Sequence, residues 1–200
     1  ERIVTIEDSA ELKLQQPHVV RLESRPPNLE GKGEVTIRDL LKNALRMRPD
    51  RIVVGECRGA EVFDMLQAMN TGHDGSMSTV HANNSQEAFT RLENMLLMTG
   101  HELPATVARH YIADAVDLIV YLSRMRDGRR RITQVTEVLG VVDGRIQSQD
   151  IFTFEYESMD AKGLIHGNFH CHTTEPNLIK KIRLYGLEEQ LTQVLKDARL

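Results

Sequence analysis

Residues 51–59, RIVVGECRG, combine a short apolar run with charged residues directly after it. The apolar run, Ile52–Gly55, is typical of a strand whose sheet is covered on both faces. A carboxylate, Glu56, follows the run directly, and Arg58 comes two residues later. Enzymes that hydrolyse nucleotides use a carboxylate at a strand end to hold Mg²⁺ through water beside a phosphate chain. The stretch therefore predicts a buried strand that ends at a candidate metal-binding acid.

The composition sets limits on fold and function. Of the 200 residues, 40% are hydrophobic and 27% are charged, which fits one domain, or one domain with an appended lobe. The 4% aromatic content and the net charge of −4 argue against a nucleic-acid partner. Two isolated cysteines, Cys57 and Cys171, form no disulfide framework and favour a reducing compartment. The sequence contains no signal peptide and no apolar run of the roughly 18 residues that a membrane helix needs.

Strand and helix patterns alternate over residues 1–122 and predict an α/β domain with a mainly parallel sheet. Strands are expected at Arg2–Ile6, His18–Leu22, Ile52–Gly55, Ser76–His81 and Leu118–Leu122. Helices are expected at Thr36–Met47, Gly59–Asn70, Ser85–Thr99 and Pro104–Ala115. Thr36 is placed to cap the first helix, and Asn84 with Glu87 three residues later is placed to cap the third.

The remainder of the chain follows a different pattern. Arg131–Val142 and Ile146–Tyr156 resemble a β-hairpin around Asp143-Gly144. Apolar residues at helical spacing in Asn177–Ala198 predict one terminal helix. We therefore expect the α/β domain to occupy residues 1–125, with a hairpin and a C-terminal helix in residues 126–200.

Acidic and histidine residues cluster at the ends of three predicted strands. They are Glu7, Asp8 and Glu11 after the first strand, Glu56 after the third, and His81 after the fourth, with His73 just before that strand. Ligands bind at the carboxyl edge of an open α/β sheet, so these groups are expected to converge on one crevice. Considered alone, each of these residues is explained more simply as a capping or surface residue of a turn or loop than as part of a site. Their shared placement favours a site in which carboxylates hold Mg²⁺ and orient water while a histidine contacts phosphate.

A glycine-rich phosphate loop of the form G-x-x-x-x-G-K-[ST] is missing from this sequence. In the nearest candidate, Gly31-Lys32-Gly33, a glycine follows the lysine, and Pro26 stands five residues before Gly31. This segment is more typical of a loop. Because the chain begins at Glu1, without Met and inside a strand-like run, we expect it to be part of a longer protein.

Three ordered motifs resemble those of the bacterial type II/type IV secretion ATPase superfamily. TIEDSAEL (residues 5–12) resembles its Asp box, and the segment ALRMRPDRIVVGECRGAEVFDMLQAMNTGHDGSMSTVHANN (residues 44–84) resembles its Walker B and His boxes. Within the superfamily the CpaF-type motor of tight-adherence (Flp) pili is most similar. HVVRLESRPPNLEGKG (residues 18–33) and QEAFTRLENMLLM (residues 86–98) fit that subfamily, and the resemblance extends to roughly residue 155.

The resemblance implies a partial RecA-like (P-loop NTPase) domain from a homo-hexameric motor, with ATP and Mg²⁺ bound at subunit interfaces. Such a motor hydrolyses ATP to drive pilus assembly or protein secretion. It works in the cytoplasm, peripheral to the inner membrane, with inner-membrane platform proteins as partners. The family's phosphate loop precedes the Asp box, so this chain is expected to be a carboxyl-terminal part of the motor that is inactive alone.

The resemblance also implies roles for single residues. Glu56 corresponds to the Walker B carboxylate on the metal side, and Asp8 is a second candidate near the metal. Glu7 and Glu11 are candidates for activating the attacking water, and Glu11 is favoured. His73 and His81 match the histidines of the His box, and Arg58 matches the arginine after the Walker B acid; these three are the phosphate-sensing candidates.

The segment between the motifs holds arginines that can act on a neighbouring subunit's nucleotide. These candidates are Arg21, Arg25, Arg38 and Arg46. An arginine supplied in trans can raise the hydrolysis rate about 10³-fold or more. Solvated surface charge is an equally good interpretation of each.

Two alternatives to the motor stay open. The first is a non-catalytic regulatory or interaction domain derived from the same fold. The second is a zinc-binding module in HGNFHCH, where His166, His170, Cys171 and His172 fall at short spacing. Because His flanks Cys171 on both sides, one short segment gives poor tetrahedral geometry, and a surface hairpin or a tail without a role of its own is favoured there.

Overall fold

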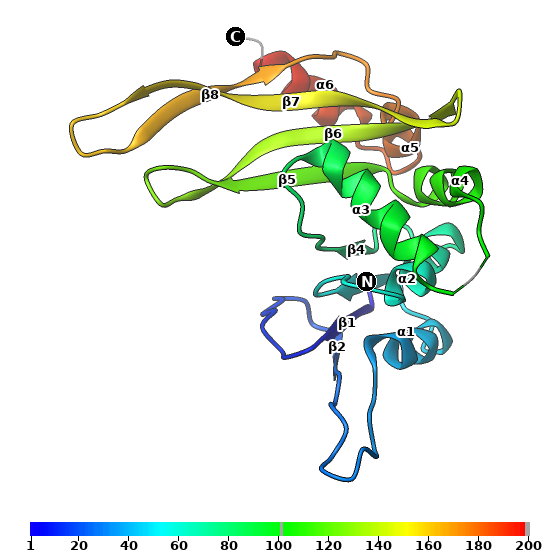
Figure 1. The fold of residues 1–200 in the computed structure, drawn as a ribbon. Coiled ribbons are helices and arrows are strands. Elements are labelled where there is room, and N and C mark those ends of the chain that lie inside the picture. The colour runs from blue at the N-terminus through cyan, green and yellow to red at the C-terminus, as the bar shows by residue number, and fades with distance from the viewer. Residues whose placement is uncertain (101, 199–200) are drawn as a thin grey trace. The chain divides into compact units, whose positions relative to one another are not determined.

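The computed structural model describes residues 1–100 and 102–198, which form two compact units (Figure 1). The first unit comprises Glu1–Asn83 and Glu87–Ala115. The second comprises Asn84–Gln86 and residues 116–198. Within the described part of the chain, each helix is too short or too polar to span a bilayer.

The first unit is built on a four-stranded parallel sheet in the order β2-β1-β3-β4. Its strands are β1 (Ile3–Glu7), β2 (Val19–Glu23), β3 (Arg51–Val54) and β4 (Met77–Ser78). Ile6 lies opposite Leu22 on one side and Val54 on the other. Val4, Ile6, Ile52 and Val54 share one face of the sheet and are at most 1% exposed, and Ile3 and Thr5 on the other face of β1 are 6% and 0% exposed. The central strand β1 is therefore covered on both faces. The predicted α/β class with a mainly parallel sheet is confirmed.

Four helices accompany this sheet. They are α1 (Ile37–Arg46), α2 (Glu61–Asn70), α3 (Ser85–Leu97) and α4 (Ala105–Ala115). Thr36 caps α1 as predicted, in a reciprocal capping box with Asp39. Phe63 of α2 stacks on Tyr111 of α4, with ring centroids 5.4 Å apart. At the start of α3, the Glu87 carboxylate accepts a hydrogen bond from the backbone N–H of Asn83 at 3.1 Å.

The second unit contains a four-stranded antiparallel sheet in the order β5-β6-β7-β8. Its strands are β5 (Leu118–Arg124), β6 (Arg130–Val142), β7 (Arg145–Met159) and β8 (Ile165–Cys171). The predicted β6–β7 hairpin is confirmed, and Asp143 and Gly144 both take the positive φ that its two-residue turn requires. The strand at Leu118–Leu122, expected within the first domain, instead pairs with β6. β8 lies in a segment without a strand-like run of β-branched residues.

The prediction of one terminal helix is wrong, because two short helices occupy that segment. They are α5 (Ile179–Leu184) and α6 (Glu188–Asp197). Gly186 lies between them with φ of 69°, a left-handed conformation that ends a helix. Leu195 of α6 is 1% exposed and packs with Ile151 and Cys171 of the sheet.

A buried acid fixes the start of α5 to the sheet. Glu137 of β6 is 1% exposed, and its two carboxylate oxygens accept the backbone N–H groups of Asn177 and Leu178, each at 3.0 Å. The side-chain amide of Gln149 donates to the same carboxylate. Glu137 thereby satisfies backbone donors that a helix start leaves without an internal partner.

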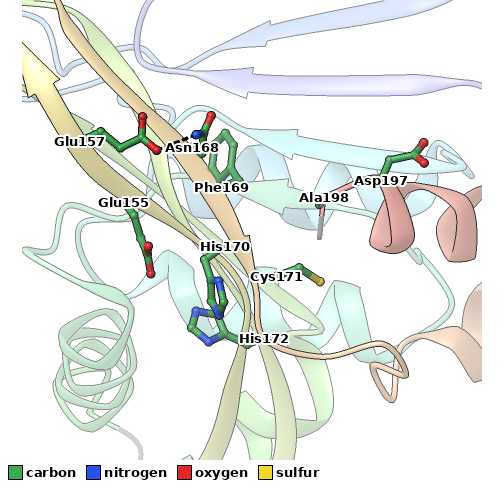
Figure 2. Close-up of a pocket in the computed structure, with 9 residues that line it drawn as sticks. All are labelled: Glu155, Glu157, Asn168, Phe169, His170, Cys171, His172, Asp197 and Ala198. Carbon is green, nitrogen blue, oxygen red and sulfur yellow. Dashed lines mark hydrogen bonds between the residues drawn. The ribbon is translucent and has the colours of Figure 1, made fainter. Parts of the chain in front are cut away.

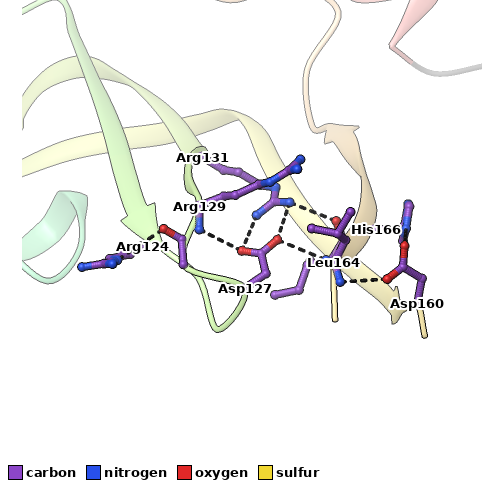
Figure 3. A network of polar contacts seen from close by, with 9 residues as sticks. Arg124, Asp127, Arg129, Arg131, Asp160, Leu164 and His166 are labelled. Carbon is purple, nitrogen blue, oxygen red and sulfur yellow. Dashed lines mark hydrogen bonds and ion pairs between the residues drawn. The ribbon is translucent and has the colours of Figure 1, made fainter. Parts of the chain in front are cut away.

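The β5–β6 turn is closed by an acid that also reaches strand β8 (Figure 3). Asp127 accepts from both terminal nitrogens of Arg131, at 2.9 and 2.6 Å, and from the backbone N–H of Ile165 at 3.1 Å. Arg131 in turn donates to the carbonyl oxygen of Ile165 at 3.1 Å. The pair therefore occupies a backbone donor and acceptor of an edge strand that would otherwise need another partner. The Arg131 guanidinium holds the pKa of Asp127 well below its ordinary value.

We expect Asp127→Asn to lower the Tm by several degrees at pH 7, because it removes the charge-assisted bonds to Arg131. A depressed folded-state pKa contributes stability above the unfolded-state value of about 3.9, and that contribution is lost as the pH falls. The Tm difference between wild type and variant should therefore shrink between pH 5 and pH 2. Asp143→Asn, in the other hairpin turn, is the matched control and should leave the Tm almost unchanged. A Tm difference independent of pH would contradict the ionic role of Asp127.

Candidate active site

Parallel pairing brings the strand-end residues to one edge of the first sheet. Val54 lies opposite Ile6 on one side and Ser78 on the other, so the residues that follow β1, β3 and β4 share the carboxyl edge. We call the polar residues there the carboxyl-edge cluster: Glu7, Asp8, Glu56, Arg58 and His81. The expected convergence of these strand ends is thus present in the structure.

Glu7 is the buried acid of the cluster, at 5% exposure. Its Oε1 accepts the backbone N–H groups of Glu11 and Leu12, both at 3.0 Å, and so fixes the loop after β1. Its Oε2 is buried and has no hydrogen-bond partner within the described residues. A Cβ atom at Gly55 would lie 3.2 Å from Cγ of Glu7, so the glycine leaves room for this side chain.

Glu56 lies between two exposed nitrogen donors. The Arg58 guanidinium donates to Oε1 of Glu56, and Nε2 of His81 lies 3.5 Å from Oε2. The Glu56 side chain is 23% exposed, whereas those of Arg58 and His81 are 68% and 82% exposed. The Glu56 carboxylate raises the pKa of Arg58, with smaller contributions from Asp8 and Glu61. A carboxylate that suits a cation, Glu56, therefore lies next to exposed nitrogen donors that suit an anion.

Two residues that the sequence analysis missed hold the backbone around Glu56. Oε1 of Glu61, at the start of α2, accepts the N–H groups of Arg58 at 2.6 Å and Gly59 at 2.8 Å. The Thr79 hydroxyl donates to the carbonyl of Gly55 at 2.7 Å, and the Thr79 carbonyl accepts from the N–H of Cys57 at 2.9 Å. An acid in the first turn of a predicted helix was the available signal for Glu61. Nothing in the sequence pattern singled out Thr79.

Cys57 follows Glu56 directly but is not suited to act as a nucleophile. It is 2% exposed, and its sulfur contacts Met65 and the Ser78 hydroxyl. Burial raises the pKa of the thiol to about 12, so it stays protonated near neutral pH.

The other two acids of the first motif are exposed. The Ser24 hydroxyl, just after β2, donates to Asp8 at 2.8 Å. The backbone N–H of Ser24 donates to the Glu7 carbonyl at 2.9 Å, so Asp8 is joined to the end of β2. Glu11 contributes its N–H to Glu7 while its own side chain is exposed.

The structure does not bring His73 to the carboxyl-edge cluster. Its Nδ1 lies 3.2 Å from the carbonyl oxygen of Ala68, near the end of α2. In the same turn, the Gly75 carbonyl accepts from Arg51, the first residue of β3, at 2.8 Å. The turn that contains His73 is therefore at the amino edge of the sheet, whereas His81 is at the carboxyl edge.

The four candidate trans-acting arginines differ in their surroundings. Nε of Arg38 donates to the buried Asp64 at 2.6 Å and joins α1 to α2. Nε of Arg25 donates to the carbonyl of Gly33 at 2.7 Å within the loop after β2. Arg21 and Arg46 are both exposed.

The zinc-module alternative finds no support in the second unit. Within residues 1–100 and 102–198, no group of three or more His, Cys, Asp or Glu side chains is arranged to hold a metal ion. Cys171 is 4% exposed and packs in the core with Leu195. His170 and His172 line an open pocket and contact each other edge to face, with ring centroids 4.6 Å apart (Figure 2). The segment forms the edge of a β-hairpin, as favoured in the sequence analysis.

The carboxyl edge of the first sheet offers carboxylate oxygens of the kind that bind Mg²⁺. Mg²⁺ in phosphate sites usually takes one or two carboxylates and completes its shell with water and phosphate oxygens. Oε2 of Glu7 and Oε2 of Glu56 are both buried without a hydrogen-bond partner in the described part of the chain. A buried carboxylate oxygen left without a partner is costly unless water or a cation reaches it.

The chain is similar to proteins that are named for conjugal transfer. The chain is 46% identical over 166 residues to a protein of Mycobacterium tuberculosis (strain H37Rv) provisionally named a conjugal transfer protein, covering 83% of this chain and 46% of that protein. It is 34% identical over 158 residues to the conjugal transfer protein TrbB of Rhizobium radiobacter, covering 79% of this chain and 45% of that protein. The chain thus spans about half the length of these relatives.

A solved structure agrees with this result. The crystal structure of the VirB11 ATPase from the Brucella suis type IV secretion system, in complex with sulphate, matches with a TM-score of 0.58 and 35% identity. The match covers 67% of this chain and 39% of the VirB11 chain, and it supports the RecA-like interpretation of the α/β fold. Residues 1–136 match the family described as Type II/IV secretion system protein. Since that match covers more than half of the sequence, the chain belongs to the type II/IV secretion system protein family.

Proposed function

We propose that this chain supplies the acidic side of an ATP-hydrolysing site in a secretion or pilus-assembly motor. The carboxyl-edge cluster is the observation that carries the proposal. It combines two carboxylates, each with a buried oxygen that makes no hydrogen bond within the described residues, with the exposed donors of Arg58 and His81. The solved relative is named an ATPase of a type IV secretion system, which supports the same activity.

Each residue of the cluster has a part in this proposal. Bound Mg²⁺ would neutralise charge on the phosphate chain of ATP. Glu56 would hold the metal through water, with Asp8 as a second candidate ligand. Arg58 and His81 donate to phosphate oxygens that carry charge in the transition state, which is how preorganised donors accelerate phosphoryl transfer.

The acid that orients the attacking water is proposed to be Glu11. Glu7 already uses one oxygen to hold the loop N–H groups of Glu11 and Leu12, which makes it a positioning residue. The Glu11 side chain is exposed on the loop that Glu7 fixes. His73, at the other edge of the sheet, has no part in this arrangement.

The wider setting belongs to the same proposal. We place the chain in a CpaF-type motor of tight-adherence (Flp) pili that forms a hexamer at the inner membrane with platform proteins of the pilus. Arg21 and Arg46 are the preferred trans-acting arginines, because they are exposed. Arg25 and Arg38 already bond within their own chain.

The 200 residues contain no phosphate loop, so we propose that hydrolysis needs the rest of the full-length protein and that this chain alone is inactive. The same observation favours a second candidate, a non-catalytic interaction domain that keeps the sheet without the loop. A phosphate loop encoded upstream of Glu1 would support the motor, and a coding sequence without one would support the second candidate.

In the full-length protein we expect Glu56→Gln to lower the turnover number of Mg·ATP hydrolysis about 10²-fold or more, while ATP still binds. The amide keeps the shape of the side chain but loses the charge that attracts the metal. Steady-state phosphate release and nucleotide titration measure the two effects separately. Glu30→Gln, which removes an exposed acid in the loop after β2, is the matched control. Unchanged turnover in the Glu56 variant would contradict the assignment.

The two water-activation candidates differ in the effect that their removal should have on stability. Glu7→Ala leaves two loop N–H groups without their acceptor, and we expect it to lower the free energy of unfolding by about 1–3 kcal/mol. Glu11→Ala should change it by less than about 0.5 kcal/mol and still lower turnover about 10²-fold. Urea unfolding and phosphate release on the same full-length samples check both. Full activity in the Glu11 variant would show that Glu11 does not activate the attacking water.

A further inference from the structure

The tip of the β5–β6 hairpin concentrates positive charge in a chain that is otherwise acidic. Residues 124–131, RMRDGRRR, contain five arginines and one aspartate, a formal charge of +4. The whole chain carries −4, so all other residues together carry −8. A local charge of this size opposite in sign to the remainder indicates a surface that attracts anions.

Asp127, the one acid in residues 124–131, already accepts several hydrogen bonds within the chain. Asp127 accepts two bonds from Arg131 and one each from the backbone N–H groups of Ile165 and Arg129 (Figure 3). It is therefore not available to Arg124, Arg126, Arg129 or Arg130, all of which are exposed. In the described part of the chain, no guanidinium group of these four arginines donates to a carboxylate, and that of Arg124 donates to the carbonyl of Gly128 at 3.3 Å.

Two of these arginines lie directly opposite each other. Arg124 is the cross-strand partner of Arg130 in the antiparallel pair of β5 and β6. Like charges at directly opposite positions destabilise a sheet, so this arrangement lowers stability in the unbound protein. An anion between the two guanidinium groups would relieve the repulsion.

The backbone of the tip is fixed before any ligand arrives. The N–H of Met125 donates to the carbonyl of Arg129 at 3.0 Å, and the N–H of Gly128 donates to the carbonyl of Met125 at 2.9 Å. Gly128 takes a positive φ of 78° that the turn needs. The Asp127–Arg131 pair fixes the turn to β8, so less conformational entropy is lost when an anion binds.

We propose that the β5–β6 hairpin tip is a phosphate-binding site, with Arg124, Arg126, Arg129 and Arg130 as its donors. The planar guanidinium group matches phosphate oxygens in a bidentate way, which lysine cannot reproduce. The shared chemistry is a phosphate group, and its source is either an anionic lipid headgroup or a soluble polyphosphate. The site lies outside the carboxyl-edge cluster and does not depend on the proposed ATPase function.

The test compares two triple variants of the 200-residue chain that have the same net charge. Arg126→Gln/Arg129→Gln/Arg130→Gln removes three charges from the tip and leaves the Asp127–Arg131 pair intact. Arg91→Gln/Arg145→Gln/Lys196→Gln removes three exposed charges elsewhere and is the matched control. The probes are sodium tripolyphosphate, followed by calorimetry, and vesicles of phosphatidylglycerol with phosphatidylcholine, followed by co-sedimentation at low and physiological salt.

We expect the wild-type chain to bind at least one probe and the control to bind within about threefold of it. The tip variant should bind about 100-fold more weakly, from roughly fivefold for each of the three charges lost at an anionic surface. Binding of vesicles but not tripolyphosphate identifies a lipid headgroup, and the converse identifies a soluble phosphate; either outcome supports the site. An equal loss in both triple variants, or no binding of either probe by wild type, overturns the proposal.

A second readout is independent of ligand binding. If the repulsion between Arg124 and Arg130 is real, Arg130→Gln should raise the Tm at low ionic strength, and added salt should remove the difference. Arg145→Gln, at the start of β7, should show no such salt-dependent gain. A lower Tm for the Arg130 variant at low salt would show that its charge is satisfied within the chain and would overturn the proposal.

Discussion

The parallel pairing of β1 with β3 is the constraint on which the site depends. Val4 and Ile6 on one strand, with Ile52 and Val54 on the other, are at most 1% exposed. A slip of one residue would move Ile52 and Val54 to the face of β3 on which Arg51 and Val53 are only half-buried, so burial favours this register. In that register Gly55 lies beside Glu7, and the loop that begins after β3 and contains Glu56 lies at the same sheet edge as the loop after β1. The chemistry of the edge is thus a consequence of core packing in the centre of the sheet.

Loop conformation in both units is fixed by one recurring device, a carboxylate that accepts two backbone N–H groups. Glu7 holds the loop after β1, and Glu61 holds the loop after Glu56. Glu137 holds the start of α5, and Asp127 holds its own turn and β8. Hydrogen bonds to an ionised acceptor are stronger than neutral ones, so a single side chain can order several residues. The loops that carry Arg58 and Glu11 are therefore preorganised.

Sequence patterns predicted the parts of the fold in which local and tertiary preferences agree. The strand before Glu56, the Thr36 helix cap and the Asp143-Gly144 turn each depend on short-range chemistry, and all three are present. β8 was expected only as part of a surface hairpin and without bounds, because its pairing with β7, not β-branched composition, makes it a strand. The terminal helix was predicted as one because apolar spacing outweighed Gly186, whose positive φ breaks it. For the site, strand ends located the acids, but placing His73 and Thr79 requires knowledge of which sheet edge each loop reaches.

We propose above all that the carboxyl edge of the parallel sheet faces bound nucleotide. Hydrogen–deuterium exchange of the full-length protein, with and without Mg²⁺ and a non-hydrolysable ATP analogue, is the decisive experiment. We expect slower exchange with nucleotide in residues 8–12, 56–61 and 79–83, which follow β1, β3 and β4. Residues 71–75, in the turn at the amino edge, should exchange at the same rate with and without nucleotide. Protection confined to residues 71–75, or no protection after β1 and β3, would show that nucleotide does not bind at the carboxyl edge.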